Sequence, residues 1–245
     1  MKRIKYISFV FIGIVVIVIA ALCLNKKDDA QSLYERGNDY RLGKGVEVNS
    51  EKAIYWWHEA AKLGSDSAQY VLGECFLNGR GVSRDRKQAE FWYRKAAEQG
   101  NADAQLHLAD LLGNNSAEAL QLLQILSEQG NTEAMFSLGW YYIYSDSVRD
   151  VNKATYWYRK AAEQGDAVAQ IALGDCYFKG LGVAMDYDKA VYWYRKAVDQ
   201  GDPRAMEALA KCYEEGKGVV KDAGQAAYWR NKVEEYYSGY TAVHN

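Results

Sequence analysis

A short motif with glycine as its next-to-last residue occurs five times along this 245-residue chain, and this repetition constrains the fold more than any other feature. The motif is AAEQGN at residues 96–101 and AAEQGD at residues 161–166, with close variants elsewhere. Its glycines recur every 30 to 36 residues, at Gly64, Gly100, Gly130, Gly165 and Gly201. A period of this length is typical of solenoids, because one unit cannot bury its apolar face alone and must pack on the next. The sequence therefore predicts six stacked units, at about residues 32–67, 68–103, 104–133, 134–168, 169–204 and 205–240.

Each unit is predicted to contain two helices. In the second unit, residues 68–79 form the first helix and residues 86–100 form the second. Gly100 is suited to end that second helix in the left-handed conformation, and Asn101 is suited to cap the helix that follows. Apolar side chains of the second helix recur with the spacing of an amphipathic helix, at Ala89, Trp92, Tyr93, Ala96 and Ala97. We therefore expect an all-α fold.

The full repeat pattern is A-x-x-x-L-G-x-x-Y/F-x-x-G-x-G-V followed by K/Q-A-x-x-W-Y-x-K-A-A-x-x-G. Over roughly residues 30–237 it resembles the Sel1-like repeat, a TPR-like helical repeat. The third unit lacks the glycine connection, and the fourth has YSDSVRD at residues 144–150 in its place. The resemblance implies a right-handed superhelical solenoid over residues 30–240, followed by a tail at 241–245. It also implies that the curved surface of the solenoid binds another protein.

The N-terminus carries a separate signal. Residues 6–24 contain no charged side chain, and this segment is long enough for a helix to cross the hydrocarbon layer of a membrane. Basic residues precede this segment, so the positive-inside rule places residue 1 in the cytoplasm and the rest of the chain outside. We therefore expect residues 1–29 to be an anchor in the inner membrane of a Gram-negative bacterium, with the solenoid in the periplasm. Two alternatives stay open: a cleaved signal peptide that leaves a soluble periplasmic protein, and a lipoprotein attached through Cys23.

The charge balance argues against nucleic acid as a partner. The chain has 30 basic and 32 acidic residues, and three of the basic ones precede residue 6, so the remainder has a net charge of −5. Such a surface offers neither the basic footprint of a nucleic-acid-binding protein nor a patch for anionic lipid. The histidines lie far apart in the sequence, at His58, His107 and His244, so no metal site is predicted.

Motifs for catalysis and for cofactors are missing from the sequence. It contains no G-x-S-x-G elbow, and no Lys-Ser/Thr follows the G-x-G-V segments as a phosphate loop requires. The recurring Trp-Tyr pairs are interpreted as packing residues. Cys75, Cys176 and Cys212 hold equivalent positions in separate units, about 20 Å apart, which is too far for disulfides, so they are predicted to be buried free thiols. We expect no catalytic residues, no cofactor and no enzyme activity.

One face of the first helices varies between units. Three positions of each first helix, spaced i, i+4 and i+8, lie on this face, and the middle one is polar in every unit except the fourth, where it is Trp140. A tryptophan held in solvent there is suited to anchor a partner, and neighbouring acids would attract a basic one. The alternative is that Trp140 fills the gap left by the missing loop. The partner-binding residues predicted on this face are Tyr70, Glu74, Asp110, Phe136, Trp140, Tyr144 and Asp175.

Together these features predict a non-catalytic, membrane-anchored scaffold that binds a partner protein on the concave face of its repeats. Two other functions stay open. Some anchored Sel1-like proteins resemble this layout and act as immunity proteins, which neutralise a secreted antibacterial toxin such as a lipase in the periplasm. A cell-wall hydrolase is the second alternative, and the missing nucleophile motif and metal cluster argue against it.

Overall fold

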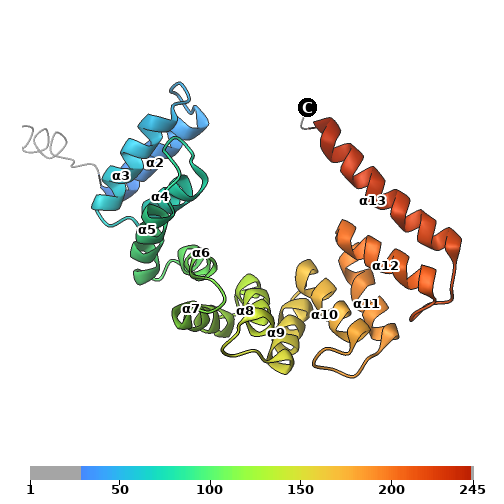
Figure 1. Ribbon diagram of the computed structural model, residues 1–245. Helices are drawn as coiled ribbons and strands as arrows, with labels where there is room; N and C mark the ends of the chain where they lie inside the picture. The colour runs from blue at the N-terminus through green and yellow to red at the C-terminus, as the bar shows by residue number, and fades with distance from the viewer. Residues whose placement is uncertain (1–28, 244–245) are drawn as a thin grey trace, which may run out of the picture. The chain divides into compact units, whose positions relative to one another are not determined.

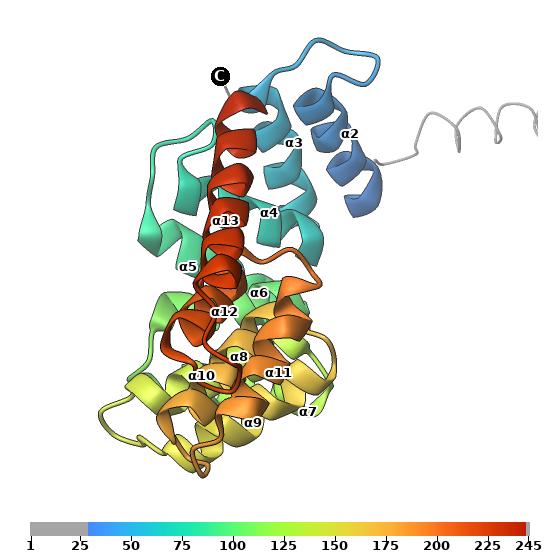
Figure 2. The same ribbon diagram turned by 90° about the vertical axis from the view of Figure 1, so that its right-hand side faces the viewer.

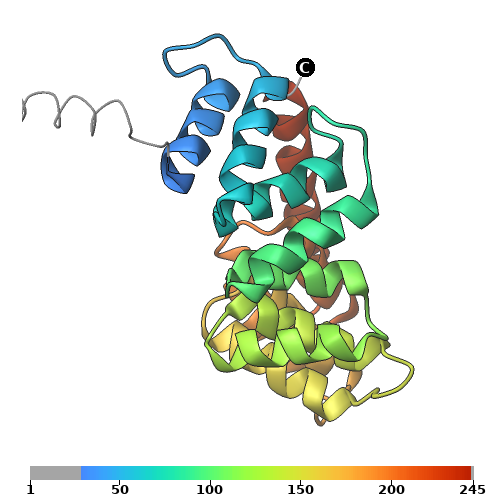
Figure 3. The same cartoon turned by 90° about the vertical axis from the view of Figure 1, so that its left-hand side faces the viewer.

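The computed structural model describes residues 29–243, and within this range it consists of helices without strands (Figure 1). The chain divides into two compact units, with the boundary in the sequence between Ala104 and Gln105. In most repeats the two helices pack side by side as a hairpin (Figure 2, Figure 3). The helices are α2 (Ala30–Leu42), α3 (Ser50–Lys62), α4 (Asp66–Asn78), α5 (Arg86–Glu98), α6 (Ala102–Leu112), α7 (Ala117–Glu128), α8 (Thr132–Tyr144), α9 (Val151–Glu163), α10 (Ala167–Lys179), α11 (Tyr187–Val198), α12 (Pro203–Glu215) and α13 (Ala223–Val243). The all-α fold is thereby confirmed, whereas the right-handed superhelix stays a prediction.

Side-chain caps fix where the helices begin. The Asn101 side chain accepts a hydrogen bond from the backbone N–H of Ala104 at 2.9 Å, as the sequence predicts. Gly100 has φ +86°, so the predicted left-handed end of the preceding helix is confirmed as well. The helix α4 starts at Asp66, two residues earlier than the sequence pattern indicates, because the Ser65 hydroxyl serves as its cap.

A glycine beneath an aromatic ring joins the two helices of most repeats. A Cβ atom added to Gly174 would lie 2.5 Å from Cε1 of Tyr194, so only glycine leaves room for the ring. The third and sixth repeats hold alanine in place of the glycine, and their ring position is occupied by Leu123 and by Arg230. A glycine at this position of the first helix therefore occurs together with an aromatic ring on the second helix, and an alanine occurs where that ring is missing. The glycine–aromatic pairs are Gly37 with Trp57, Gly73 with Tyr93, Gly139 with Tyr158, and Gly174 with Tyr194.

The second glycine of each G-x-G-V segment allows neighbouring repeats to approach closely. Gly182 has φ +65°, and a Cβ atom there would lie 2.5 Å from the carbonyl oxygen of Val151, at the start of the preceding repeat's second helix. The equivalent Gly45 belongs to the first repeat that the structure describes, and nothing lies within 4 Å of its Cβ position. The recurrence of the second glycine in these turns is thus explained by close contact between repeats as well as by chain reversal.

The recurring aromatic pairs and the cysteines are packing residues. Tyr93 and Tyr194 are buried, and the tryptophans beside them are partly buried against the apolar clusters, which confirms their predicted role. Cys75, Cys176 and Cys212 are buried free thiols, also as predicted. Burial raises the pKa of Cys75 and of Cys212 to about 11, so these thiols stay protonated at neutral pH.

The predicted membrane anchor falls outside the described part of the chain. Residues 6–24, Cys23 and His244 all lie outside residues 29–243. Among the helices that the structure does describe, none has the length and apolar character to cross a membrane. The anchor and the periplasmic location therefore stay predictions from the sequence.

Candidate functional site

In the two most regular repeats, the acid in the middle of the first-helix face is hydrogen-bonded within its own repeat. Here the first-helix face means the side of α2, α4, α6, α8, α10 and α12 that carries the i, i+4 and i+8 positions. The Tyr194 hydroxyl of the fifth repeat donates to Asp175 Oδ1 at 2.7 Å, and Lys179 Nζ donates to Asp175 Oδ2 at 2.6 Å. In the second repeat the Tyr93 hydroxyl donates to Glu74 in the same way. Burial and this hydrogen bond both raise the pKa of Tyr93 and of Tyr194, so the phenols remain donors.

The third and fourth repeats each lack one member of this acid–tyrosine pair. The third keeps the acid, Asp110, but has Leu123 where the tyrosine would be. The fourth keeps the tyrosine, Tyr158, but has Trp140 where the acid would be. Among the residues that the structure describes, neither the Asp110 carboxylate nor the Tyr158 hydroxyl forms a hydrogen bond. An exposed acid without an internal hydrogen bond and an unusual tryptophan thus lie in consecutive repeats.

Trp140 lies on the surface of α8. It is 44% exposed, and its ring centroid is 4.1 Å from that of Tyr144, which is 53% exposed. Phe136, one turn before Trp140, is partly buried with its ring 5.6 Å from Tyr158. The three aromatic side chains predicted on this helix therefore form a continuous strip, with its outer end in solvent.

Other residues fill the gap left by the missing loop. Tyr141 is 2% exposed, and its hydroxyl donates to the carbonyl oxygen of Ser116 at 2.8 Å. The neighbouring Tyr142 is buried and accepts a hydrogen bond from Gln124. Ser145, which ends the helix, is also buried. The local repacking that the sequence allowed for is carried out by these residues, while Trp140 remains exposed.

The aromatic strip borders a pocket that contains Asp110. This pocket has a volume of about 400 Å³ and is lined by Asp110, Phe136 and Trp140, together with Glu133 and Arg204. Arg204 is already paired with Asp202, at 2.6 Å. Burial raises the pKa of Asp110; the charge of His107 lowers it and that of Glu133 raises it. A partly desolvated carboxylate beside an exposed indole is a suitable site for a cationic side chain.

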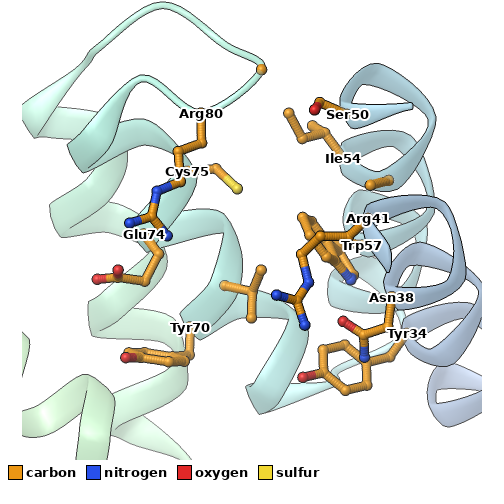
Figure 4. A pocket seen from close by; sticks show the side chains of 13 residues that line it. Tyr34, Asn38, Arg41, Ser50, Ile54, Trp57, Tyr70, Glu74, Cys75 and Arg80 are labelled. Atoms are coloured by element: carbon orange, nitrogen blue, oxygen red, sulfur yellow. The ribbon is translucent and has the colours of Figure 1, made fainter. Parts of the chain in front are cut away.

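The N-terminal unit holds a second pocket, of about 590 Å³, between α2, α3 and α4 (Figure 4). Tyr70 and Glu74 line it, so these two predicted residues belong to a different site from Asp110 and Trp140. Arg41 and Arg80 also line it, and neither was predicted, because neither holds an i, i+4 or i+8 position of the first-helix face. A usable signal existed for Arg41, since three of the five equivalent positions are apolar, Leu77, Ile143 and Phe178, and no other repeat has a basic residue there.

The seven predicted residues are therefore not one site. Asp110, Phe136 and Trp140 share a pocket, and the Tyr144 ring packs against Trp140 in a tilted arrangement. Asp175 lies one repeat further along and is held by Tyr194 and Lys179. Glu133 and Arg204 were not predicted, because they reach the pocket from the first turns of α8 and α12 rather than from the first-helix face. Within the described residues, no three His, Cys, Asp or Glu side chains are grouped so as to hold a metal ion.

Comparison with solved structures finds helical repeat proteins. The chain is similar to a Sel1 repeat protein from Oxalobacter formigenes, with 34% identity and a TM-score of 0.76 over 84% of this chain and 85% of that one. It is also similar to a protective antigen of uropathogenic Escherichia coli that displays an SLR fold, with 30% identity and a TM-score of 0.73 over 84% of this chain and 46% of the other. An immunity protein of Pseudomonas aeruginosa has 20% identity and a TM-score of 0.55 over 86% of this chain and 82% of its own, which shows likeness of fold alone.

One curated protein matches over a short stretch. It is HRD3A, a component of an ERAD-associated E3 ubiquitin-protein ligase of Arabidopsis thaliana, 33% identical over 67 residues. The matching stretch is 26% of this chain, and it spans only about a tenth of the length of that relative.

The model of the Sel1 repeat matches this sequence six times. The matched residues are 30–65, 66–101, 102–131, 132–166, 167–202 and 203–229. These matches begin about two residues before the units read from the sequence, in line with the caps that start the first helices, and they include the two irregular repeats. The chain belongs to the Sel1 repeat family.

Proposed function

We propose that this protein is a non-catalytic scaffold that binds a partner protein on the first-helix face of its third and fourth repeats. The observation that supports this most is the exposed Trp140–Tyr144 pair next to Asp110, whose carboxylate has no internal hydrogen bond. Large aromatic side chains at the centre of an interface commonly contribute most of its binding energy. The Sel1 repeats provide the rigid helical framework for such a surface.

The chemistry of the pocket defines the partner's side of the contact. A lysine or arginine of the partner would lie against the face of Trp140 and pair with Asp110. A cation–π contact of this kind contributes about 0.5–2 kcal/mol, and a hydrogen bond to a charged group about 1.5–3 kcal/mol. The partner segment is therefore basic, with an apolar residue beside the cation to cover Phe136.

The cellular setting of this proposal rests on the sequence alone. We place the scaffold in the periplasm, held to the inner membrane through residues 6–24. The immunity hypothesis draws on neighbours that are 20% identical, a level that supports the fold only, so we do not adopt it. A hydrolase function finds no residue arrangement to support it in the described part of the chain.

The proposal is tested by quantitative capture of partners with the full chain from extracts of its source organism. Trp140→Ala is expected to weaken capture about 30-fold, equivalent to about 2 kcal/mol, because it removes the aromatic anchor. Tyr156→Ala is the matched control, since Tyr156 is 53% exposed on the second helix of the same repeat. Circular dichroism melting of each variant verifies folding. Equal capture by the wild type and Trp140→Ala would overturn the proposal, as would equal losses in both variants.

A further inference from the structure

The pocket of the N-terminal unit has a character opposite to that of the Trp140 site. Arg41 enters it from the last turn of α2 and Arg80 from the loop after α4, so two guanidinium groups approach it from opposite walls (Figure 4). Tyr34 and Tyr70 lie at its lower edge in this view. Apolar side chains, including Ile54, complete the lining. The pocket is thus a basic one with aromatic and apolar walls.

Both arginines retain unpaired charge. Among the side chains that the structure describes, neither Arg41 nor Arg80 has a hydrogen-bond or ion-pair partner. Burial raises the pKa of Cys75 in the pocket wall, whereas the charges of Arg80 and Arg41 both lower it. Both guanidinium groups therefore act electrostatically on the same wall of the pocket. Glu74, the acid of this pocket, already accepts hydrogen bonds from Tyr93 and Asn78. Two cations therefore face one carboxylate that is engaged elsewhere.

The first repeat also lacks the hydrogen-bonded acid of the second and fifth repeats. Asn38 occupies the position held by Glu74 and Asp175, and Trp57 occupies that of the tyrosine that pairs with the acid. The Trp57 Nε1 atom is buried without a hydrogen-bond partner in the described structure. The acid–tyrosine pair is therefore absent, and α2 presents Arg41 without a neutralising carboxylate at that position.

We propose that this pocket binds an aspartate or glutamate side chain in an extended segment of a partner protein. Arginine binds carboxylates through paired, charge-assisted hydrogen bonds, and the charge complementarity is direct. A peptide is the occupant because the tyrosine and aliphatic walls offer contact area that a free inorganic anion would leave unused. The choice of a peptide rests on the proposed scaffold function, but the site lies in the other compact unit and selects the opposite charge.

The test is fluorescence anisotropy with the full chain and a labelled, end-blocked peptide, Gly-Leu-Glu-Leu-Glu-Leu-Gly. We expect this peptide to bind about tenfold more tightly than its Gln counterpart, because each lost ion pair removes a charge-assisted contact. Arg41→Gln and Arg80→Gln are each expected to weaken binding about tenfold. Both side chains are exposed, so folding is retained. Asn38→Asp, which introduces the acid of the later repeats, is expected to weaken binding as well.

Lys87→Gln is the matched control, because it removes the same charge from an exposed position on α5. It is expected to leave peptide binding unchanged, as is Trp140→Ala in the other unit. Equal binding of the Glu and Gln peptides would overturn the inference, as would wild-type affinity in both arginine variants. Displacement of the peptide by an equimolar amount of inorganic phosphate would overturn the choice of a peptide carboxylate. In each of these cases Trp140-dependent capture would still stand, so the two proposals fail separately.

Discussion

The second and fifth repeats differ from the third and fourth at the middle position of the first-helix face, where only the former hold an acid that is hydrogen-bonded within the repeat. In the regular repeats, the middle acid of the first helix accepts a hydrogen bond from the buried tyrosine of the second helix. In the irregular repeats the acid and the tyrosine are separated, with Asp110 in one repeat and Tyr158 in the next. The comparison shows how a solenoid can create a binding surface without changing its fold, because a polar group released from an internal bond becomes available to a partner.

The same comparison explains why Trp140 can be exposed without loss of the repeat structure. Gly139 still lies beneath the Tyr158 ring, so the packing between α8 and α9 follows the regular pattern. The changed residue, Trp140, is exposed and packs against Tyr144 instead. Exposure at this position is therefore separate from the stability of the repeat, and the variants below make use of this separation.

The largest expected effect is on binding, from a variant that turns the fourth repeat into a regular one. Trp140→Asp supplies the missing acid to Tyr158 and removes the aromatic anchor. Partner capture should fall by about 30-fold or more, as for a lost hot spot, while the free energy of unfolding should change by less than about 1 kcal/mol. Chemical denaturation and capture measured together check this. A variant that unfolds readily would mean that Trp140 is a packing residue.

The next effect is on stability, through the glycine beneath the ring. Gly174→Ala places a Cβ atom 2.5 Å from the Tyr194 ring, so overpacking should lower the free energy of unfolding by about 1–3 kcal/mol. Urea denaturation provides the measurement. As a control, Gly174→Ala combined with Tyr194→Leu copies the alanine and leucine of the third repeat and should recover part of the loss. No recovery would argue against the coupling of small residue and ring.

A smaller effect separates the two kinds of tyrosine. Tyr194→Phe removes the hydroxyl that donates to Asp175 and should cost about 1 kcal/mol of stability. Tyr158→Phe removes a hydroxyl that has no hydrogen bond in the described structure, so its cost should be close to zero. Thermal unfolding of both variants measures the difference. Equal costs would contradict the claim that the fourth repeat lacks the internal bond.

The smallest effect concerns the titration of Asp110. Its pKa in the folded protein is raised above the unfolded value, so ionisation opposes folding and this cost is present at neutral pH. The cost disappears as the pH falls through the raised pKa and Asp110 becomes protonated. Asp110→Asn should therefore raise stability at pH 7 by less than about 1 kcal/mol, since the carboxylate is still partly solvated. The gain should shrink at acidic pH. Partner capture should weaken in this variant at neutral pH, where the wild-type carboxylate is ionised, and the difference in capture should also shrink at acidic pH. A stability gain that grew on acidification would contradict the assignment.

Much of the fold was accessible from the sequence, because the repeat reveals itself through Gly100, Asn101 and their equivalents. These residues specify local conformations, a left-handed turn and a cap, which depend on few neighbours. The comparison of equivalent positions gave the exposure of Trp140 only as one of two alternatives, because the indole could also have filled the gap left by the missing loop. The loss of the tyrosine partner of Asp110 was harder to predict. It depends on Leu123, which holds the tyrosine position on the second helix, and a comparison along the first-helix face alone does not include that position.

The pocket in the N-terminal unit was harder to predict for the same reason. Arg41 lies next to the analysed face on α2, and Arg80 lies in a loop. Only packing of α2, α3 and α4 brings them to one place, and no single helix period relates them. For Arg41, a signal was available in the charge at a position that is apolar in the second, fourth and fifth repeats; for Arg80 there was none, because Lys44 and Lys217 hold the equivalent position in other repeats.

The central claim, that the partner binds where the third and fourth repeats lose their internal pair, is tested most directly by site-specific photo-cross-linking. A photoreactive benzoylphenylalanine is introduced in place of Trp140, Asp175 or Tyr156 in the full chain, and the cells are irradiated. We predict a discrete cross-linked complex from position 140, and none from position 175, which lies in a regular repeat, or from position 156 on the second helix. Cross-links of equal yield at positions 156 and 140, or a complex formed only from position 175, would contradict the account.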